Sequence, residues 1–311
     1  MSDVYSSDMH TSDAQPMDEC QTNNVSRTLR PVRVGHIEFL NCYPLYYGLG
    51  KRSSTTTPFE LQAGVPTDLN RMLVAGTIDF GPISSIAYAL NHRLLALSRR
   101  LSISSRGAVD SIQLVCRRPL EELETIALTP QSATSVVLLK TLLRLRYRRE
   151  VHYSEMRGSS EEELNRCDAV LLIGDQGLEA MYFPLEETIR YDLGVLWNAW
   201  TGLPMVYAVW AARADFLRRR SGDLAEVEKE LAGAMAYSRG RAAEMVESAR
   251  GHYRFGRSCL TRYFEVLHYG FEEAYQAGLL RFYQLAHQAG ELPEVPALRF
   301  IDEMVGEGEM R

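Results

Sequence analysis

Apolar and polar residues alternate near residue 32 in a pattern that predicts a strand, a turn and a helix. The run Val32–Ile37 alternates with a period of two, as in a strand with one buried face. Leucine and aromatic residues follow Pro44, which suits the first turn of a helix. We expect the strand to end near Phe39 and the turn to carry Asn41. Such turns lie at the carboxyl edge of a sheet, where open α/β folds bind ligands.

Asn41 is therefore the first candidate for chemistry in this chain. The alternative is that its side chain only caps the helix that follows. The neighbouring Cys42 is a weaker candidate, because a nucleophilic thiol needs a nearby base or cation, and a small buried cysteine is the more frequent case.

The strand, turn and helix pattern recurs at three further turns with short polar side chains. A strand over Thr77–Gly81 leads to two serines and a helix, and the strand Ala169–Ile173 ends in a glycine and an acid. Between them, a strand over Thr125–Leu128 leads to a hydroxyl-rich loop and an amphipathic helix over Val136–Tyr147. The candidate binding residues at these turns are Ser84, Ser85, Ser132, Thr134, Ser135, Gly174 and Asp175.

The hydroxyl-rich loop at 132–135 gives the strongest prediction of an anion site. Free N–H groups and the dipole at a helix start favour an anion by about 0.3–1 kcal/mol, so a carboxylate suits this position. The alternative for the serines is that they serve as plain N-caps. For Asp175 we favour a helix cap over a role in orienting a catalytic group.

Two successive blocks of strands and helices are expected, one before about Ser111 and one from there to about Val206. From Asp223 on, the pattern predicts helices alone. Right-handed crossovers make strands parallel, so each block is expected to be a small sheet with helices on its faces. Two such lobes would bring the polar turns to one cleft that suits a small anionic ligand.

One stretch, Leu193–Ala212, has no charged residue and is long enough to span a bilayer. Polar residues, Gly202 and Pro204 interrupt it, however. It is therefore better interpreted as a helix around two tryptophans, a turn, and a buried strand over Met205–Trp210.

Composition and charge limit the function classes. The 311 residues are 46% hydrophobic and 24% charged, which is typical of a folded globular protein of about two domains. The net charge of −6 provides no basic field for a phosphate backbone or an anionic membrane surface. We therefore expect a small-molecule substrate and neither nucleic acid nor membrane as a partner.

Several absences in the sequence favour a cytoplasmic protein without cofactor or metal. Residues 1–30 are polar and acidic and lack the apolar run of a secretory signal, which predicts a disordered tail. Five cysteines without a CxxC pair favour a reducing compartment, and the seven histidines show no metal-ligand spacing. Neither GxGxxG after a strand nor a P-loop motif occurs, so no nucleotide cofactor is expected.

Five motifs together resemble the chorismate dehydratase family of the futalosine route to menaquinone. The likeness runs from about Val32 to the end of the last long helix, in the family's order, and leaves out the tail. The motifs are GHIEFLNCYPLYYGL, TIDFGPISS, SATSVVLL, AVLLIGD and LGVLWNAWTGLPMVYAVWAA.

The resemblance implies an α/β fold of the periplasmic-binding-protein type II class, used as an enzyme without a cofactor. Each lobe would be a small mixed sheet with flanking helices, and crossover strands would join the lobes. Residues 31–113 plus 208–311 would form the first lobe and residues 114–207 the second, with the active site in the cleft between them.

The family removes water from chorismate to give 3-[(1-carboxyvinyl)oxy]benzoate, and the resemblance implies the same hydro-lyase reaction here. The family's active-site asparagine matches Asn41, and its serine near the first crossover matches Ser111. The hydroxyls of Ser132, Thr134 and Ser135 match a loop that the family directs toward a substrate carboxylate. Ser84 and Ser85 depart from the family pattern, which leaves their role open.

Two other classes remain as alternatives at this stage. One is a cytoplasmic protein of the same fold that binds or senses a small anion without turning it over. The other is the related 1,4-dihydroxy-6-naphthoate synthase of the same pathway. The FLNCYPL segment resembles the dehydratase more closely than the synthase.

Overall fold

The computed structural model describes residues 30–52 and 59–304, and from Pro31 on the chain forms one compact unit. Of the expected disordered tail over residues 1–30, all but Arg30 lies outside the described residues. Within the part described, no helix is long and apolar enough to cross a bilayer.

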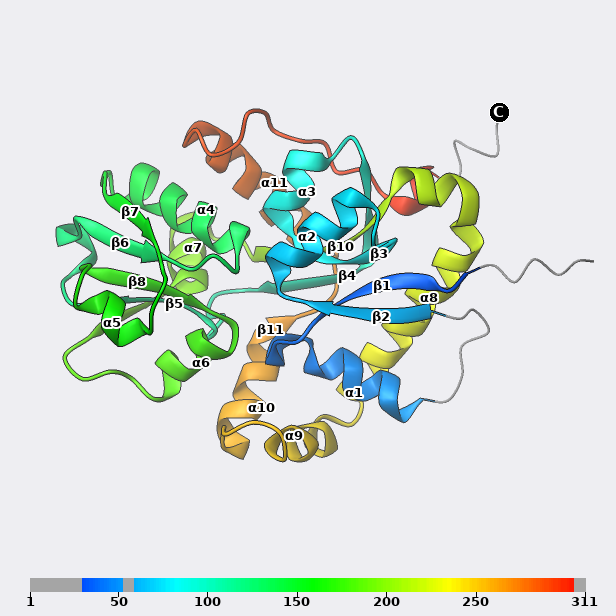
Figure 1. The fold of residues 1–311 in the computed structure, drawn as a ribbon, viewed down its shortest axis with the longest axis horizontal. Helices are drawn as coiled ribbons and strands as arrows, with labels where there is room; N and C mark the ends of the chain where they lie inside the picture. Colours follow the sequence, from blue (N-terminus) through cyan, green and yellow to red (C-terminus); the bar gives the residue numbers. More distant parts are fainter. Residues whose placement is uncertain (1–29, 53–58, 305–311) are drawn as a thin grey trace, which may run out of the picture. The chain divides into compact units, whose positions relative to one another are not determined.

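The first sheet combines the strands up to Ser105 with two strands that come after residue 204 (Figure 1). Its order is β11-β4-β10-β3-β1-β2, in which β1 pairs in parallel with β2 and β3, while β10 is antiparallel to β3 and β4. Its strands are β1 (Val32–Ile37), β2 (Phe59–Gly64), β3 (Phe80–Ser84), β4 (Leu95–Ser105), β10 (Met205–Arg213) and β11 (Leu267–His268).

The second sheet holds the intervening strands in the order β7-β6-β8-β5-β9. Strand β6 is parallel to β7 and β8, and β5 is antiparallel to β8 and β9. Its strands are β5 (Ile112–Cys116), β6 (Thr125–Leu128), β7 (His152–Glu155), β8 (Ala169–Ile173) and β9 (Ile189–Asp192). Both sheets are thus mixed, as the family resemblance implies, and not purely parallel as the crossover argument alone predicts.

Helices pack on both sheets and predominate after β10, where the short strand β11 interrupts the region expected to hold helices alone (Figure 1). Helices α2, α3, α8 and α11 contact the first sheet, and α5, α6 and α7 contact the second. The helices are α1 (Tyr43–Lys51), α2 (Pro66–Ala75), α3 (Ser85–Asn91), α4 (Ala133–Thr141), α5 (Ser160–Leu164), α6 (Gly174–Tyr182), α7 (Leu193–Thr201), α8 (Ala214–Arg239), α9 (Ala242–Arg250), α10 (Arg257–Val266) and α11 (Glu273–Gln288).

The core follows the predicted periodicity where the pattern is strong. Val32, Val34 and Ile37 of β1 are buried, and the uncharged stretch from residue 193 forms α7 and then β10, as expected. The strand expected over Thr77–Gly81 is shifted, because its first residues form the turn after α2 and β3 continues to Ser84. This shift places Ser84 at the very end of a strand and Ser85 at the first residue of a helix.

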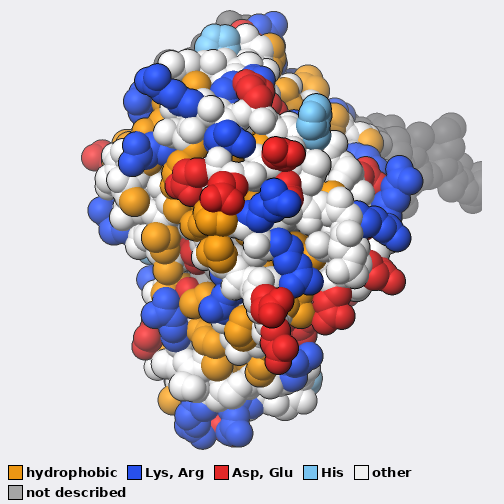
Figure 2. Space-filling model, turned by 90° about the vertical axis from the view of Figure 1, so that its left-hand side faces the viewer, with side chains coloured by type: hydrophobic (Ala, Val, Ile, Leu, Met, Phe, Trp, Pro, Cys, Tyr) orange, Lys and Arg blue, Asp and Glu red, His pale blue; other side chains and the backbone are white. Residues whose placement is uncertain are grey.

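Charges of both signs are interspersed on the face of the molecule that Figure 2 shows. Blue and red side chains alternate over it, with apolar side chains between them. Such a distribution creates no extended positive field on this face.

Candidate active site

The polar turns meet around a small cavity of about 50 Å³. Six of the nine residues that the sequence nominates line it, from the ends of β1, β3 and β8 and the starts of β5 and α4. The lining residues are Ile37, Phe39, Asn41, Pro66, Ser84, Ile103, Val109, Ser111, Ile112, Ser132, Ser135, Ile173, Gly174, Tyr207, Ala208 and Leu267. The carboxyl ends of parallel strands thus converge here, as open α/β folds require.

Asn41 lines the cavity and does not cap a helix. It lies in a short 3-10 turn over Leu40–Cys42, and α1 has no side-chain cap. The side-chain oxygen of Asn41 is buried and has no hydrogen-bond partner among the described residues. Its backbone carbonyl accepts a hydrogen bond from the Tyr269 hydroxyl at 2.9 Å, which fixes the turn. A buried, unpaired acceptor in a cavity is costly for folding unless a ligand uses it.

Ser111 precedes β5 and lines the same cavity. The Tyr263 hydroxyl of α10 is buried beside it; burial raises the pKa of Tyr263 well above its usual value, and the interaction with Ser111 opposes this only in part. The phenol is therefore neutral at physiological pH and available for hydrogen bonding.

The start of α4 supplies two cavity hydroxyls, from Ser132 and Ser135. The Ser132 oxygen accepts from the backbone N–H of Ser135 at 3.2 Å and donates to its hydroxyl at 2.9 Å. Ser132 is therefore an N-cap, as the alternative interpretation held, and it also faces the cavity. The two roles coexist.

Ser84 is held in the cavity wall by a pair of hydrogen bonds from α2. The Asn70 side-chain amide donates to the Ser84 hydroxyl at 3.1 Å, and the Ser84 backbone N–H donates to the Asn70 oxygen at 2.9 Å. The Ser84 side chain makes no cap bond to α3.

The remaining three candidates, Ser85, Thr134 and Asp175, do not line the cavity and instead make hydrogen bonds to other turns of the site. The hydroxyls of Ser85 and Thr134 are 3.2 Å apart, and Thr134 also accepts from the Ile86 N–H at 3.2 Å. The Asp175 carboxylate accepts from the Leu40 N–H at 3.0 Å, and burial raises the pKa of this carboxyl. Asp175 thus links the segment after β8 to the turn that carries Asn41 after β1. It is not the N-cap of α6, which is Ile173, so the favoured capping interpretation is wrong.

Two glycines of α6 allow this segment to pack tightly against the cavity. Gly174 has a φ of 58°, and a Cβ there would lie 2.9 Å from the Phe39 ring. A Cβ on Gly177 would lie 2.2 Å from the backbone oxygen of Ser111. Neither position has space for a larger residue, so α6 sets the distance between Phe39, Ser111 and the cavity.

Titratable groups are sparse in the cavity wall. Of the described residues that line it, only Tyr207 has a titratable side chain, and burial raises the pKa of that phenol well above its usual value. Cys42 is buried, and burial alone raises its thiol pKa far above the usual range, which contradicts a nucleophilic thiolate. Among the described residues, no group of three His, Cys, Asp or Glu side chains could hold a metal.

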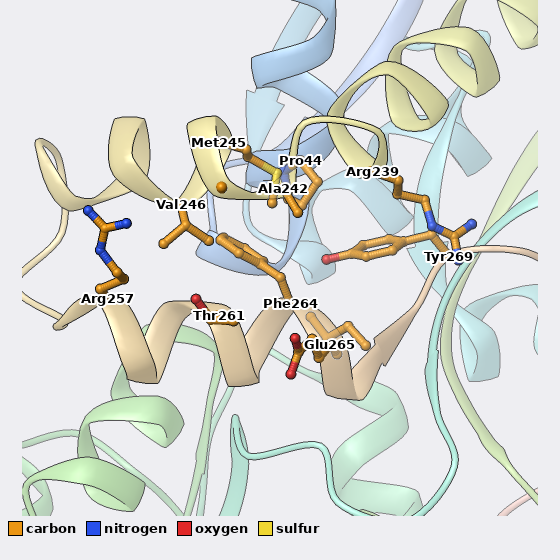
Figure 3. A pocket seen from close by; sticks show the side chains of 12 residues that line it. Pro44, Arg239, Ala242, Met245, Val246, Arg257, Thr261, Phe264, Glu265 and Tyr269 are labelled. Carbon is orange, nitrogen blue, oxygen red and sulfur yellow. The ribbon is translucent and has the colours of Figure 1, made fainter.

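A larger hollow of about 380 Å³ is lined mainly by residues of the helices after β10 (Figure 3). Pro44, Phe264 and Tyr269 line it, with Arg239 at one end and Arg257 at the other. Leu267 lines both hollows. Six of the nominated residues line the smaller cavity and none lines the larger one, so the smaller cavity is the candidate site.

Sequence reasoning missed the residues that support Ser111. Asp110 is completely buried, and Asp192 accepts hydrogen bonds from the N–H groups of Val109 and Asp110 at 3.1 and 2.7 Å. Asp192 also caps α7. An Asp before an apolar run is a cap signal that the sequence offered, but its contact with residues 109 and 110 depends on pairing between β5 and β9.

Comparison with known proteins gives the chain its family. Residues 32–288 match the family described as menaquinone biosynthesis. The curated chorismate dehydratase of Thermus thermophilus is 31% identical, over 82% of this chain and 94% of that protein.

Solved structures agree on the fold. The alkanesulfonate-binding protein SsuA of Xanthomonas axonopodis pv. citri superposes with a TM-score of 0.63 at 12% identity, covering 88% of this chain and 97% of that one. A Candida albicans gene product described as having the generic periplasmic binding protein fold reaches a TM-score of 0.61 at 9% identity, over 90% and 96%. The fold is thus that of periplasmic binding proteins, and the chain belongs to the chorismate dehydratase family of menaquinone biosynthesis.

Proposed function

We propose that this enzyme is a hydro-lyase that converts chorismate to 3-[(1-carboxyvinyl)oxy]benzoate and water. Family membership supports the reaction. The observation that carries it is the buried, unpaired amide oxygen of Asn41 in a cavity that also holds Ser111 and has no charged side chain in its described wall.

The dehydration of chorismate is compatible with a cavity wall that has no charged side chain. A ring C–H bond breaks and its electrons form a ring double bond, while a C–O bond breaks and its electrons leave with the hydroxyl group. The proton and the hydroxide together make water, and the ring becomes aromatic, which favours the product strongly. The enzyme then needs to position the substrate more than to supply a strong acid or base. In our proposal the substrate's own enolpyruvyl carboxylate takes the ring proton.

Asn41 and Ser111 hydrogen-bond the reacting ring substituents in this proposal. Ser132 and Ser135, with the N–H groups at the start of α4, hold a carboxylate through directed hydrogen bonds and the helix dipole. Ser84 and Gly174 complete the wall. Ser85, Thr134 and Asp175 do not line the cavity, and we assign them contacts that form when the site closes; direct substrate contact by these three stays a prediction.

We further propose that the cavity widens to admit substrate. Ligand pockets usually measure about 300–1,000 Å³, whereas this cavity measures about 50 Å³. Residues 31–113 plus 208–311 would then move as one lobe and residues 114–207 as the other. The Ser85–Thr134 and Leu40–Asp175 hydrogen bonds cross that boundary and would break on opening.

The proposal includes a cytoplasmic enzyme with a small-molecule substrate and no cofactor, nucleic acid or membrane partner. The net charge of −6 supports the exclusion of polyanions, and the face in Figure 2 carries charges of both signs. The cysteines in the described residues form no disulfide, which agrees with a reducing compartment.

The test is to incubate the purified protein with chorismate and follow the product by mass and ultraviolet spectrum. We expect loss of one water and formation of an aromatic benzoate. Asn41→Ala should lower turnover about a hundredfold or more, the scale of losing one preorganised hydrogen-bonding group. It should melt at or above the temperature of the wild type, since it removes a buried amide whose oxygen is unpaired.

Asn165→Ala is the matched control, because Asn165 is exposed at the end of α5. It should leave turnover unchanged. Intact chorismate in the wild-type reaction would overturn the dehydratase assignment. Normal turnover in Asn41→Ala would overturn the role of this residue.

A further inference from the structure

The residue before Ser111 has an unusual backbone. Asp110 has a φ of 59°, and the Ser111 N–H donates to the Val109 carbonyl at 2.7 Å, two residues back. A hydrogen bond of this kind around a residue with positive φ defines the rare, strained form of the γ-turn. The side chains on both sides of it, Val109 and Ser111, line the cavity.

Every polar group of Asp110 is held in place. Its backbone N–H donates to Asp192 at 2.7 Å, and its carbonyl accepts from the Gln113 amide at 3.0 Å. Its carboxylate is 0% exposed and receives two hydrogen bonds from Arg262, at 2.9 and 3.1 Å, and one from the Tyr182 hydroxyl at 3.2 Å.

The groups that hold Asp110 come from four separate elements, one of which is β5 with Gln113. Arg262 lies on α10, Tyr182 on α6, and Asp192 at the start of α7. Strained backbone persists only where its surroundings over-determine it, and such residues concentrate at active sites. The next residue of α10, Tyr263, lies beside Ser111. One helix thus holds the carboxylate of the turn through Arg262 and places a buried hydroxyl beside Ser111.

We propose that Asp110 is a positioning residue: its clamped, strained turn fixes the direction of the Ser111 side chain in the cavity. This inference rests on the proposed function, in which Ser111 contacts the reacting ring. Asp110 itself does not line the cavity, so it acts through Ser111 and not on the substrate. The Arg262 guanidinium makes two hydrogen bonds to the Asp110 carboxylate and compensates its buried charge, which stabilises the strained turn.

The test is a double-mutant cycle on the full chain, with turnover of chorismate as readout. Asp110→Ala removes the clamp and disfavours positive φ, and we expect kcat to fall about ten- to a hundredfold, the scale of a small misplacement of a reacting group. KM should change less than about threefold, because the lining side chains remain. In a Ser111→Ala background the same substitution should have no further effect on kcat, within about twofold.

Comparison of Asp110→Asn with Asp110→Ala separates the effect of the carboxylate charge from the effect of the backbone conformation. Asp110→Asn keeps an acceptor for Arg262 and tolerates positive φ, so it should retain clearly more activity than Asp110→Ala. Glu187→Ala is the matched control, since Glu187 is an exposed acid with a φ of 54°; it should be as active as wild type. Should Asp110→Ala fail to fold, Arg262→Gln enters the same cycle with the same expected lack of additivity.

The outcomes distinguish this inference from the proposed function. If Ser111→Ala lowers kcat and Asp110→Ala multiplies that loss in the double variant, the positioning role is overturned while the dehydratase assignment stands. Wild-type activity in Asp110→Ala likewise overturns it. If Ser111→Ala has no effect, the catalytic role of Ser111 fails, and the inference fails with it.

Discussion

The carboxylate of Asp175 shows how a single buried acid near the site affects stability. Burial raises its pKa above the value of a free aspartate, about 3.9, and the hydrogen bond from Leu40 N–H only partly compensates. A raised pKa means that the folded state prefers the protonated acid. As pH rises through the unfolded pKa toward the folded one, the unfolded state loses its proton first, and the free energy of unfolding falls.

Asp175→Asn tests this sign. The amide oxygen still accepts from Leu40 and carries no charge, so the variant should melt at a higher temperature than wild type at pH 7. The difference should shrink as pH falls below about 4, where both proteins carry a neutral side chain. Thermal melts from pH 3 to 8 measure it. A variant that is less stable at pH 7 and gains relative to wild type on acidification would contradict the assigned cause.

Single residues of the site differ in how well sequence identifies them. Asn41 and Ser111 could be nominated from family motifs, and the short polar residues from their place after strands. Asp110 could not, because its importance depends on Arg262, 152 residues away in the chain. The sequence likewise suggested a cap at Asp175. Nothing near this residue in the chain reveals that its carboxylate accepts a hydrogen bond from the N–H of Leu40, 135 residues earlier.

Helix α6 is the element whose packing most directly sets the geometry of the site. A Cβ at Gly177 would meet the carbonyl of Ser111 at 2.2 Å and that of Leu172 at 3.1 Å, both rigid backbone atoms. Gly177→Ala should therefore push α6 away from β5, destabilise the protein by about 1–3 kcal/mol as overpacking does, and lower turnover.

Gly222→Ala provides the matched control for this substitution. Gly222 lies in α8 with no atom near its Cβ position, so alanine should stabilise the helix by about 0.4–1 kcal/mol. Chemical denaturation and chorismate turnover of both variants measure the contrast. Equal stability of the two alanine variants would show that a Cβ fits between α6 and the backbone of Ser111.

Helices and strands could be predicted where residues close together in the chain determine them. The strand and helix around Asn41 and the helix and strand over 193–213 follow from periodicity, proline and glycine. Strand β4 was not expected, because adjacent Arg99 and Arg100 interrupt it and serines dominate its second half. In the fold Arg99 stacks on Phe300 and pairs with Asp302. Hydrogen bonds among the strand's serines and with residues 268 and 270 make the remaining polar groups compatible with burial.

At the scale of the whole molecule, a contact beside the cavity predicts that turnover requires opening of the site. The Ser85 and Thr134 hydroxyls, 3.2 Å apart, lie on α3 and α4, which belong to different lobes in our proposal. A Ser85→Cys/Thr134→Cys pair should form a disulfide that holds the site closed, because the two side chains already touch. The oxidised protein should lose at least about nine-tenths of its turnover, since the cavity is smaller than usual ligand pockets.

Reductant should restore the activity of the cross-linked protein. Each single cysteine variant, oxidised in the same way, is the control for effects of the substitutions and of the native thiols. Mass spectrometry of peptides establishes that the bond has formed. Full turnover by the cross-linked form would exclude opening at this contact as a step of the reaction.

The sequence by itself determined the series of strand, turn and helix units, the absence of a basic field, and the polar residues at the turns. These depend on side-chain periodicity, capping and charge, which act within a few residues. Tertiary structure alone decided that β10 returns antiparallel between β3 and β4, and that Arg262 holds the carboxylate of Asp110. It also decided that Ser85 and Thr134 contact each other, and that Asp175 contacts Leu40, without lining the cavity. These depend on contacts between residues more than forty positions apart, whose energy arises only once the sheets and helices have packed.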